Sequence, residues 1–153
     1  MKRKIVITLG IGFLSLLLLR VLIIKAIEDP VFAGLPKCEY AECYYSEGFR
    51  DYADYCKYYF LQESNIAEWL KESKYFKPAT DDYIEEIKSY FEDFEGWGEF
   101  EDYKEHYDFK CEWIDTADYF YIESKDEFNK YESYNVYFFD VQTSVLYFIH
   151  SNI

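Results

Sequence analysis

Histidine and cysteine are the side chains of this sequence best suited to catalysis near neutral pH, and both are scarce. There are two histidines, His106 and His150, and four cysteines. Cys111 follows His106 closely, and a thiol beside an imidazole can act as a nucleophile. Catalytic pairs are defined in space, however, and a strand cysteine in a disulfide explains Cys111 equally well. The sequence therefore predicts no catalytic residue and favours a binding protein over an enzyme.

The densest acidic patch offers hard oxygen ligands for a cation. It comprises Glu99, Glu101, Asp102, Glu105, His106 and Asp108. The patch lacks the Asp-rich loop of an EF-hand, and runs of charge usually serve solubility. None of the six glycines belongs to a phosphate-binding loop. We therefore expect a solvated acidic loop, no metal site and no cofactor, with a cation-dependent exported hydrolase as an alternative.

All four cysteines, Cys38, Cys43, Cys56 and Cys111, follow the amino-terminal apolar segment. An even number of cysteines in an exported domain favours disulfides. A zinc site is the alternative, but the spacing lacks the paired knuckles of structural zinc sites. We expect disulfides from Cys56 to Cys111 and from Cys38 to Cys43.

Tyrosine is concentrated between residues 40 and 59. The predicted binding surface comprises Tyr44, Tyr45, Tyr52, Tyr55, Tyr58 and Tyr59. A tyrosine ring is large and rigid with a polar tip, and neighbouring carboxylates steer a partner, so this composition suits protein recognition. It equally suits a small domain that builds its core from tyrosine. Both interpretations stay open at this point.

A single apolar run, Ile5–Ile24, determines on which side of a membrane the rest of the chain lies. A helix needs about 20 apolar residues to cross a bilayer, and this run is long enough if Arg20 reaches the interface. Basic residues at positions 2–4 keep the amino end cytoplasmic. We predict a single-pass signal-anchor at residues 1–27 that contacts the lipid bilayer through residues 5–24. The alternative is a signal peptide cleaved after residues 31–33, which gives a secreted or periplasmic protein.

The remainder of the chain is strongly acidic. Residues 28–153 hold all 30 acidic residues and 11 of the 16 basic residues, a formal charge of −19. Such a field repels nucleic acid and favours a basic protein partner, with binding that weakens as salt rises. The same residues carry 34 of the 35 aromatic residues, which a disordered acidic tail would not.

Helical spacing of apolar residues predicts three helices. Over residues 47–60 apolar side chains recur at three- and four-residue steps. A short second helix begins at Asn65 and ends before Pro78. The third runs from Thr80, as its N-cap, to Gly96. Its predicted core face comprises Ile84, Ile87, Phe91 and Phe94, with Tyr83 and Tyr90 beside them.

Beyond the third helix the period changes to two, as in half-buried strands. Residues 107–114 alternate aromatic and charged side chains, and residues 119–123 can return as the second strand of a hairpin. Residues 124–131 are polar and fit either a helical turn or a loop. Residues 134–140 and 145–150 are rich in aromatic and β-branched residues and predict a terminal hairpin.

This order of elements predicts an α+β fold. After a linker at residues 28–36, residues 37–153 form one acidic, tyrosine-rich extracytoplasmic domain. Its two or three helices pack on a roughly four-stranded antiparallel sheet. The element order resembles cystatin-like and NTF2-like folds, and this resemblance implies a shape but no site residues.

These features favour a membrane-anchored, exported binding domain that engages a basic protein. In size, charge and layout the chain resembles bacterial toxin-neutralising immunity proteins, and the resemblance implies that the basic partner is a toxin. A structural component of the cell envelope is the alternative beside the hydrolase.

Overall fold

The structure is a computed structural model that describes residues 30–32, 35–46, 52–62, 65–96, 104–124 and 131–152. The chain divides into two compact units, residues 1–35 and residues 36–153. In the first unit, the described N–H of Leu35 donates to the carbonyl of Phe32 (3.0 Å). The predicted span at residues 5–24 lies outside the described residues. No helix among the described residues is long and apolar enough to cross a membrane.

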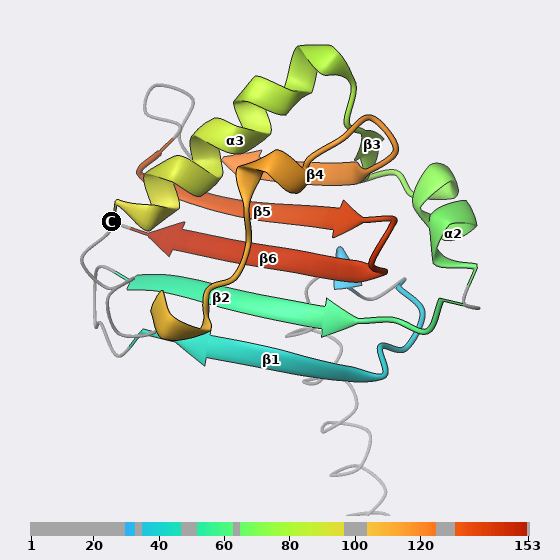
Figure 1. Ribbon diagram of the computed structural model, residues 1–153, viewed down its shortest axis with the longest axis horizontal. Coiled ribbons are helices and arrows are strands. Elements are labelled where there is room, and N and C mark those ends of the chain that lie inside the picture. Colours follow the sequence, from blue (N-terminus) through green and yellow to red (C-terminus); the bar gives the residue numbers. More distant parts are fainter. Residues whose placement is uncertain are drawn as a thin grey trace, which may run out of the picture. The chain divides into compact units, whose positions relative to one another are not determined.

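The second unit is built on one antiparallel sheet (Figure 1). Its strands are β1 (Tyr40–Tyr45), β2 (Tyr52–Tyr59), β3 (Lys77–Pro78), β4 (Tyr119–Ser124), β5 (Ser133–Asp140) and β6 (Val145–Asn152). They lie in the order β1-β2-β6-β5-β4-β3, and every neighbouring pair is antiparallel. The predicted α+β class is therefore confirmed, with six strands in place of about four.

The helix predicted at residues 47–60 is wrong, because β2 occupies Tyr52–Tyr59. β2 carries buried side chains on both of its faces: Ala53, Tyr55 and Lys57 on one face and Cys56 on the other. A strand buried on both faces does not alternate apolar and polar residues. Tyrosine fits both a buried and an exposed position, and the tyrosines of this segment happen to recur at the spacing of a helix.

The predicted strand at residues 107–114 is also wrong. These residues form an irregular segment followed by a short 3-10 helix, η4 (Cys111–Trp113). Phe109 stacks on Phe91 at a ring distance of 3.9 Å and packs against Phe138 and Tyr147 at 5.5 and 5.0 Å. The alternation of aromatic and charged residues therefore belongs to a segment that lies across the sheet. This segment directs Phe109 into the core. β4 itself was predicted, but it pairs with β3 and β5.

The terminal hairpin is confirmed as β5 and β6, which pair along their full lengths. Its tight turn follows Asp140, whose carboxylate accepts hydrogen bonds from the backbone N–H groups of Gln142 and Thr143 (2.8 and 3.1 Å). Ser144 closes the turn with a φ of 59°. An aspartate that bonds its own turn in this way fixes the register of the hairpin.

Among the residues that the structure describes, two α-helices accompany the sheet, and both were predicted. α2 (Ile66–Glu72) is short, and α3 (Asp81–Glu95) buries Ile87, Tyr90, Phe91 and Phe94. Thr80 is the N-cap residue of α3, but its side chain makes no capping hydrogen bond, and Asn65 makes none at α2. Packing of the apolar face therefore holds α3 in place more than capping does.

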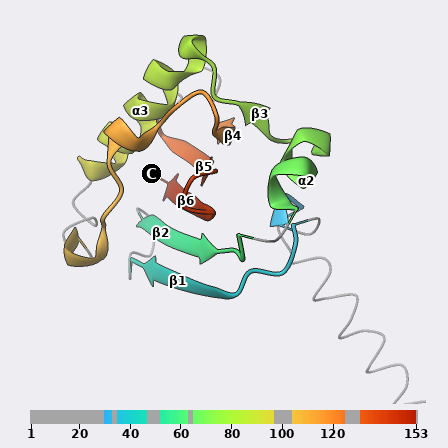
Figure 2. The same ribbon diagram turned by 45° about the vertical axis from the view of Figure 1, so that its right-hand side comes forward.

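Figure 2 shows α3 and the segment around residues 104–113 on the same face of the sheet. α3 contacts the sheet through Tyr90, whose ring lies 5.0 Å from that of Tyr134 on β5. On the opposite face Phe76, which follows α2, packs on Tyr137 of β5 at 6.4 Å. Tyr134 and Tyr137 differ by an odd number of positions on one strand and therefore point to opposite faces.

Candidate functional site

The six tyrosines of the predicted binding surface do not share one surface. Tyr44, Tyr55 and Tyr59 point to the face of the sheet that carries α3, and Tyr45, Tyr52 and Tyr58 point to the other, as the β1–β2 register requires. Tyr55 is fully buried. Its hydroxyl donates to Asp108 (3.0 Å). Only part of the predicted set can therefore contact a partner.

The most exposed tyrosines of the described chain lie on β1. Tyr45 is 66% exposed and Tyr40 is 51% exposed. The Tyr40 ring stacks on that of Tyr59 on β2, with ring centroids 4.2 Å apart. The predicted set omits Tyr40, which lies at the start of the edge strand β1. The sequence pattern predicted neither a helix nor a strand at residues 40–45, so it did not indicate this exposed position.

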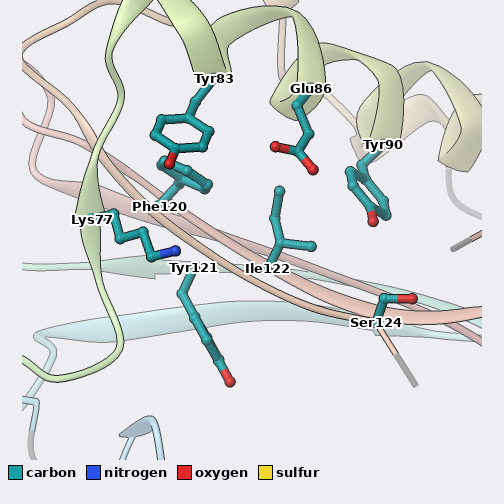
Figure 3. Close-up of a pocket in the computed structure, with 8 residues that line it drawn as sticks. All are labelled: Lys77, Tyr83, Glu86, Tyr90, Phe120, Tyr121, Ile122 and Ser124. Carbon is teal, nitrogen blue, oxygen red and sulfur yellow. The ribbon is translucent and has the colours of Figure 1, made fainter. Parts of the chain in front are cut away.

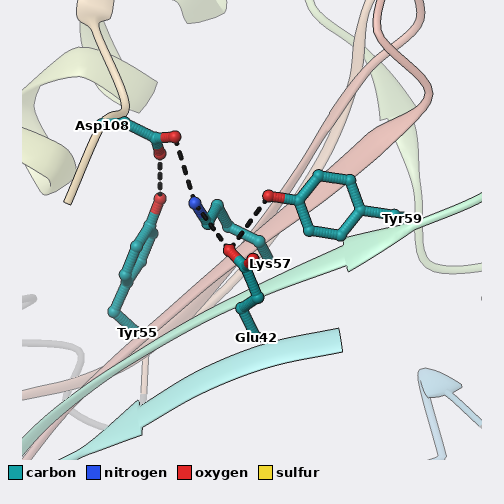
Figure 4. Close-up of polar contacts among 5 residues, drawn as sticks. All are labelled: Glu42, Tyr55, Lys57, Tyr59 and Asp108. Atoms are coloured by element: carbon teal, nitrogen blue, oxygen red, sulfur yellow. Dashed lines mark hydrogen bonds and ion pairs between the residues drawn. The ribbon is translucent and has the colours of Figure 1, made fainter. Parts of the chain in front are cut away.

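Lys57 is the centre of a polar cluster on the face of β2 that carries α3 (Figure 4). Its side chain is 7% exposed and forms ion pairs with Glu42 (2.9 Å) and Asp108 (3.0 Å). Glu42 lies directly opposite Lys57 on β1, and it also accepts a hydrogen bond from the Tyr59 hydroxyl (3.1 Å). The cluster thus joins two strands to the segment that crosses the sheet.

The electrostatics of this cluster favour the charged forms of Lys57 and Glu42 and the neutral form of Tyr55. Burial lowers the pKa of Lys57, but hydrogen bonds to Glu42 and Asp108 outweigh burial and hold that pKa above its ordinary value. The hydrogen bond from Lys57 lowers the pKa of Glu42. Burial and the Asp108 carboxylate raise the pKa of Tyr55. The cluster therefore acts as a charged cross-link between β1, β2 and the segment that contains Asp108.

A disulfide joins Cys43 on β1 to Cys56 on β2, which lie directly opposite each other. The predicted pairs Cys56–Cys111 and Cys38–Cys43 are therefore wrong, and the reason is the misassigned helix at residues 47–60. As a strand residue Cys56 faces Cys43. Cys38 and Cys111 are free thiols.

The surroundings of Cys111 disfavour the reactive form of a thiol that His106 could activate. Burial and the carboxylates of Glu95 and Glu92 raise the pKa of the Cys111 thiol to about 11, so the thiol stays protonated near neutral pH. The His106 ring stacks on Tyr44 at 4.5 Å.

The acidic patch can be followed only in part, because Glu99, Glu101 and Asp102 lie outside the described residues. Of the remaining members, Asp108 is engaged by Lys57 and Tyr55. The described residues contain no group of three or more His, Cys, Asp or Glu side chains that could hold a metal ion.

A pocket of about 260 Å³ lies between α3 and β4 (Figure 3). α3 supplies Tyr83, Glu86 and Tyr90, while β4 supplies Phe120 and Ile122. Burial and the nearby Glu86 carboxylate raise the pKa of Tyr90 to about 12, so its hydroxyl is protonated and can donate a hydrogen bond. Helical spacing had identified Tyr83 and Tyr90 only as neighbours of the core.

A second pocket, of about 290 Å³, lies beside the β5–β6 turn. Its wall includes Trp113, which is 38% exposed, and the carboxylate of Asp140. Asp140 is already engaged by the turn, including a 2.7 Å hydrogen bond from the Thr143 hydroxyl. The Asp140 carboxylate therefore serves the hairpin turn.

Comparison with known proteins gives no relative: the chain matches no protein-family model, no curated protein and no solved structure. The functional argument therefore rests on the surfaces and pockets described above.

Proposed function

We propose that this protein is a membrane-anchored, exported binding domain that engages a basic protein partner through β1. The observation that carries the proposal is the pair of exposed rings, Tyr40 and Tyr45, at the two ends of an edge strand in a strongly acidic domain. They point to opposite faces of the sheet, so a partner would contact the edge itself. Exposed tyrosines at a rigid, solvent-facing position are typical anchors of protein interfaces.

The strand holds these rings in place before a partner arrives. The disulfide from Cys43 and the ion pair from Glu42 both fasten β1 to β2. Because the strand is already ordered, binding costs little conformational entropy. The charge of −19 over residues 28–153 attracts a basic partner from a distance, and this attraction falls as salt increases.

Two further features support export and anchoring. Disulfides persist in oxidising compartments outside the cytoplasm, and the Cys43–Cys56 bond is of the structural kind that links paired strands. The apolar run at residues 5–24 has the length and basic flank of a signal-anchor. The specific form of the proposal is an immunity-type protein that neutralises a basic toxin at the membrane surface.

Site-specific photo-crosslinking in intact cells tests the proposal. A photoreactive amino acid replaces Tyr45, and a matched control replaces Lys71, an exposed residue of α2. We expect a basic protein to be captured from Tyr45 but not from Lys71, with capture lost in about 0.5 M salt because the Debye length falls to a few Å. Purified partner and purified full-length chain must then reproduce the salt-sensitive complex.

Equal capture from both positions, or capture that does not respond to salt, contradicts the proposal. A membrane-impermeant maleimide tests topology in the same cells. The Cys43 and Cys56 thiols should react only after reduction and without lysis. Labelling that requires lysis places the domain inside the cell and overturns the exported form of the proposal.

A further inference from the structure

The far edge of the sheet, opposite β1, offers a second kind of binding position. Of the described strands, only β3 lies on this side of β4, and it pairs with no more than Tyr119 and Phe120. The N–H of Ala79 donates to the carbonyl of Asp118 (2.9 Å). Alternate residues of a strand direct their backbone groups to the same side, so Phe120 and then Ile122 face this side as well. Ile122 lies past the end of β3.

The pocket between α3 and β4 opens beside Ile122. In Figure 3 the Ile122 side chain points up toward α3, while the Tyr121 side chain points to the opposite face of the sheet. The Glu86 carboxylate points from α3 toward Ile122, while the Tyr90 hydroxyl lies beside Ile122 and points toward Ser124. A volume of about 260 Å³ is below the range of about 300–1,000 Å³ typical of small-molecule sites. It suits one long side chain.

We propose that an extended, basic segment of a partner protein adds to the sheet beside Ile122 and places one lysine or arginine side chain in this pocket. The segment would run antiparallel to β4, as β3 does. Its backbone would exchange hydrogen bonds with the N–H and carbonyl of Ile122, and strand addition of this kind derives affinity from main-chain bonds and specificity from side-chain pockets.

The chemistry of the pocket selects a cation with an aliphatic stem. Phe120 and Ile122 form an apolar surface on which the methylene groups can lie. Beyond them the Glu86 carboxylate accepts hydrogen bonds from an ammonium or guanidinium group. The only basic residue among the described lining residues is Lys77, whose Nζ lies 6.0 Å from the Tyr83 ring. Lys77 is thus held toward the β3 end of the pocket, away from Tyr90.

The available length sets the size of the segment. From Tyr121 to Ser124, β4 extends four residues past its pairing with β3, or about 13 Å at the rise of a strand. A segment of four or five residues fills this length. The proposal goes beyond the function proposed for β1, because it concerns the opposite edge of the sheet and a different set of side chains.

Titration of the full-length chain in mild detergent with a blocked five-residue peptide, acetyl-Thr-Val-Lys-Val-Thr-amide, tests the proposal. Binding is measured by calorimetry and by the NMR shift of the Ile122 amide. We expect weak, saturable binding with a shift at Ile122. Three changes should each weaken binding about fivefold or more: norleucine in place of lysine, N-methylation of the peptide backbone at the residue opposite Ile122, and Glu86→Gln.

Glu92→Gln is the matched control, since Glu92 lies on the same helix but not among the lining residues. It removes the same charge from the domain and should leave the affinity within about twofold, because exposed charges away from a site contribute little. If the Glu86 and Glu92 variants weakened peptide binding equally, the peptide would respond only to the overall charge of the domain, and the proposal would be overturned. Binding that is insensitive to N-methylation would overturn it as well, and so would a peptide that shifts β1 amides and leaves Ile122 unchanged.

Discussion

The two edges of the sheet are fastened by different chemistry. At β1 a disulfide from Cys43 and an ion pair from Glu42 connect the edge strand to β2. At the other edge β3 has two residues, and the buried carboxylate of Asp118 helps to hold the adjoining turns by accepting N–H groups of Asp115 and Val141 (2.9 and 3.0 Å). One edge is closed by a covalent bond and an ion pair, and the other by a short backbone pairing of β3 with β4, beside turns that one carboxylate holds.

This difference indicates what each edge can do. An edge strand that is locked to its neighbour presents side chains with little loss of conformational entropy, so β1 suits recognition through Tyr40 and Tyr45. An edge whose strand ends after two residues leaves the backbone of Ile122 facing outward. That edge suits recognition through main-chain hydrogen bonds.

Removal of the disulfide should have the largest effect on stability. Cys43 and Cys56 are separated by 13 positions, and closing a loop of this size lowers the entropy of the unfolded chain enough to contribute about 3 kcal/mol. We expect the double variant Cys43→Ala, Cys56→Ala to lose about that amount in chemical denaturation, with faster amide exchange in β1 than in β4. Cys38→Ala, at a free thiol, is the control. Equal loss of protection in β4 would contradict a fastening that is local to β1.

Replacement of Lys57 should have the next largest effect. Lys57→Met leaves the carboxylates of Glu42 and Asp108 without their cation, and we expect it to lower the free energy of unfolding by about 2 kcal/mol. The value is below that of a fully buried pair because the two acids are 39% and 57% exposed.

Lys77→Met makes the same change at the exposed opposite edge and should cost at most about 0.5 kcal/mol. Urea denaturation measures both variants. If the Lys57 and Lys77 variants lost the same free energy of unfolding, the ion pairs of Lys57 would not distinguish the β1 edge from the β3 edge.

The misassignment of β2 shows where sequence reasoning reached its limit. α3 and the β5–β6 hairpin were predictable because their burial is one-sided or their β-branched and aromatic content is high. β2 was not, since its neighbour β6 comes from the far end of the chain, where Tyr52 pairs with Asn152. The burial of Tyr55 likewise depends on a distant segment, because the Tyr107 ring packs on it at 4.9 Å, and no local window contains these contacts.

The candidate sites show the same limit. The concentration of tyrosines between Tyr44 and Tyr59 indicated protein recognition. Which of these tyrosines are exposed, however, depends on the strand register. The pocket beside Ile122 depends on the approach of α3 to β4, two elements that the sequence identified without their relative placement. Asp108 lay within the acidic patch, yet its partner Lys57 comes from a segment 51 positions away.

Asp118 should make the β3–β4 edge sensitive to pH. Burial raises its pKa to about 6 from an ordinary value of 3.8, despite the two backbone N–H groups that it accepts. Because the folded value is the higher one, the stability from this group is complete below about pH 4 and is lost as pH rises through about 6. We expect the free energy of unfolding of wild type, relative to Asp118→Asn, to fall by about 2 kcal/mol between pH 4 and pH 7.

Urea denaturation of the two proteins at both pH values measures this difference, which cancels the titration of all other groups. Amide exchange should locate the change near Ala79 and Val141. A wild-type advantage that instead grows with pH would reverse the sign and show that hydrogen bonding outweighs burial at Asp118.

Tyr45→Ala should have the smallest effect on stability. Its side chain is 66% exposed, so we expect the free energy of unfolding to change by no more than about 0.5 kcal/mol. Capture of the basic partner should nevertheless weaken, which separates a recognition role from a structural one. A loss of stability as large as that of Lys57→Met would mean that Tyr45 helps to hold β1 against β2.

The central position of β6 governs the order in which the chain can complete its sheet during synthesis. β1 and β2 are neighbours in sequence and can form their hairpin early, but both β2 and β5 pair with β6, which ends at Asn152. As the chain emerges from its amino end, the two halves of the sheet stay apart until β6 (Val145–Asn152) has been synthesised. Loss of β6 alone would therefore separate the two halves.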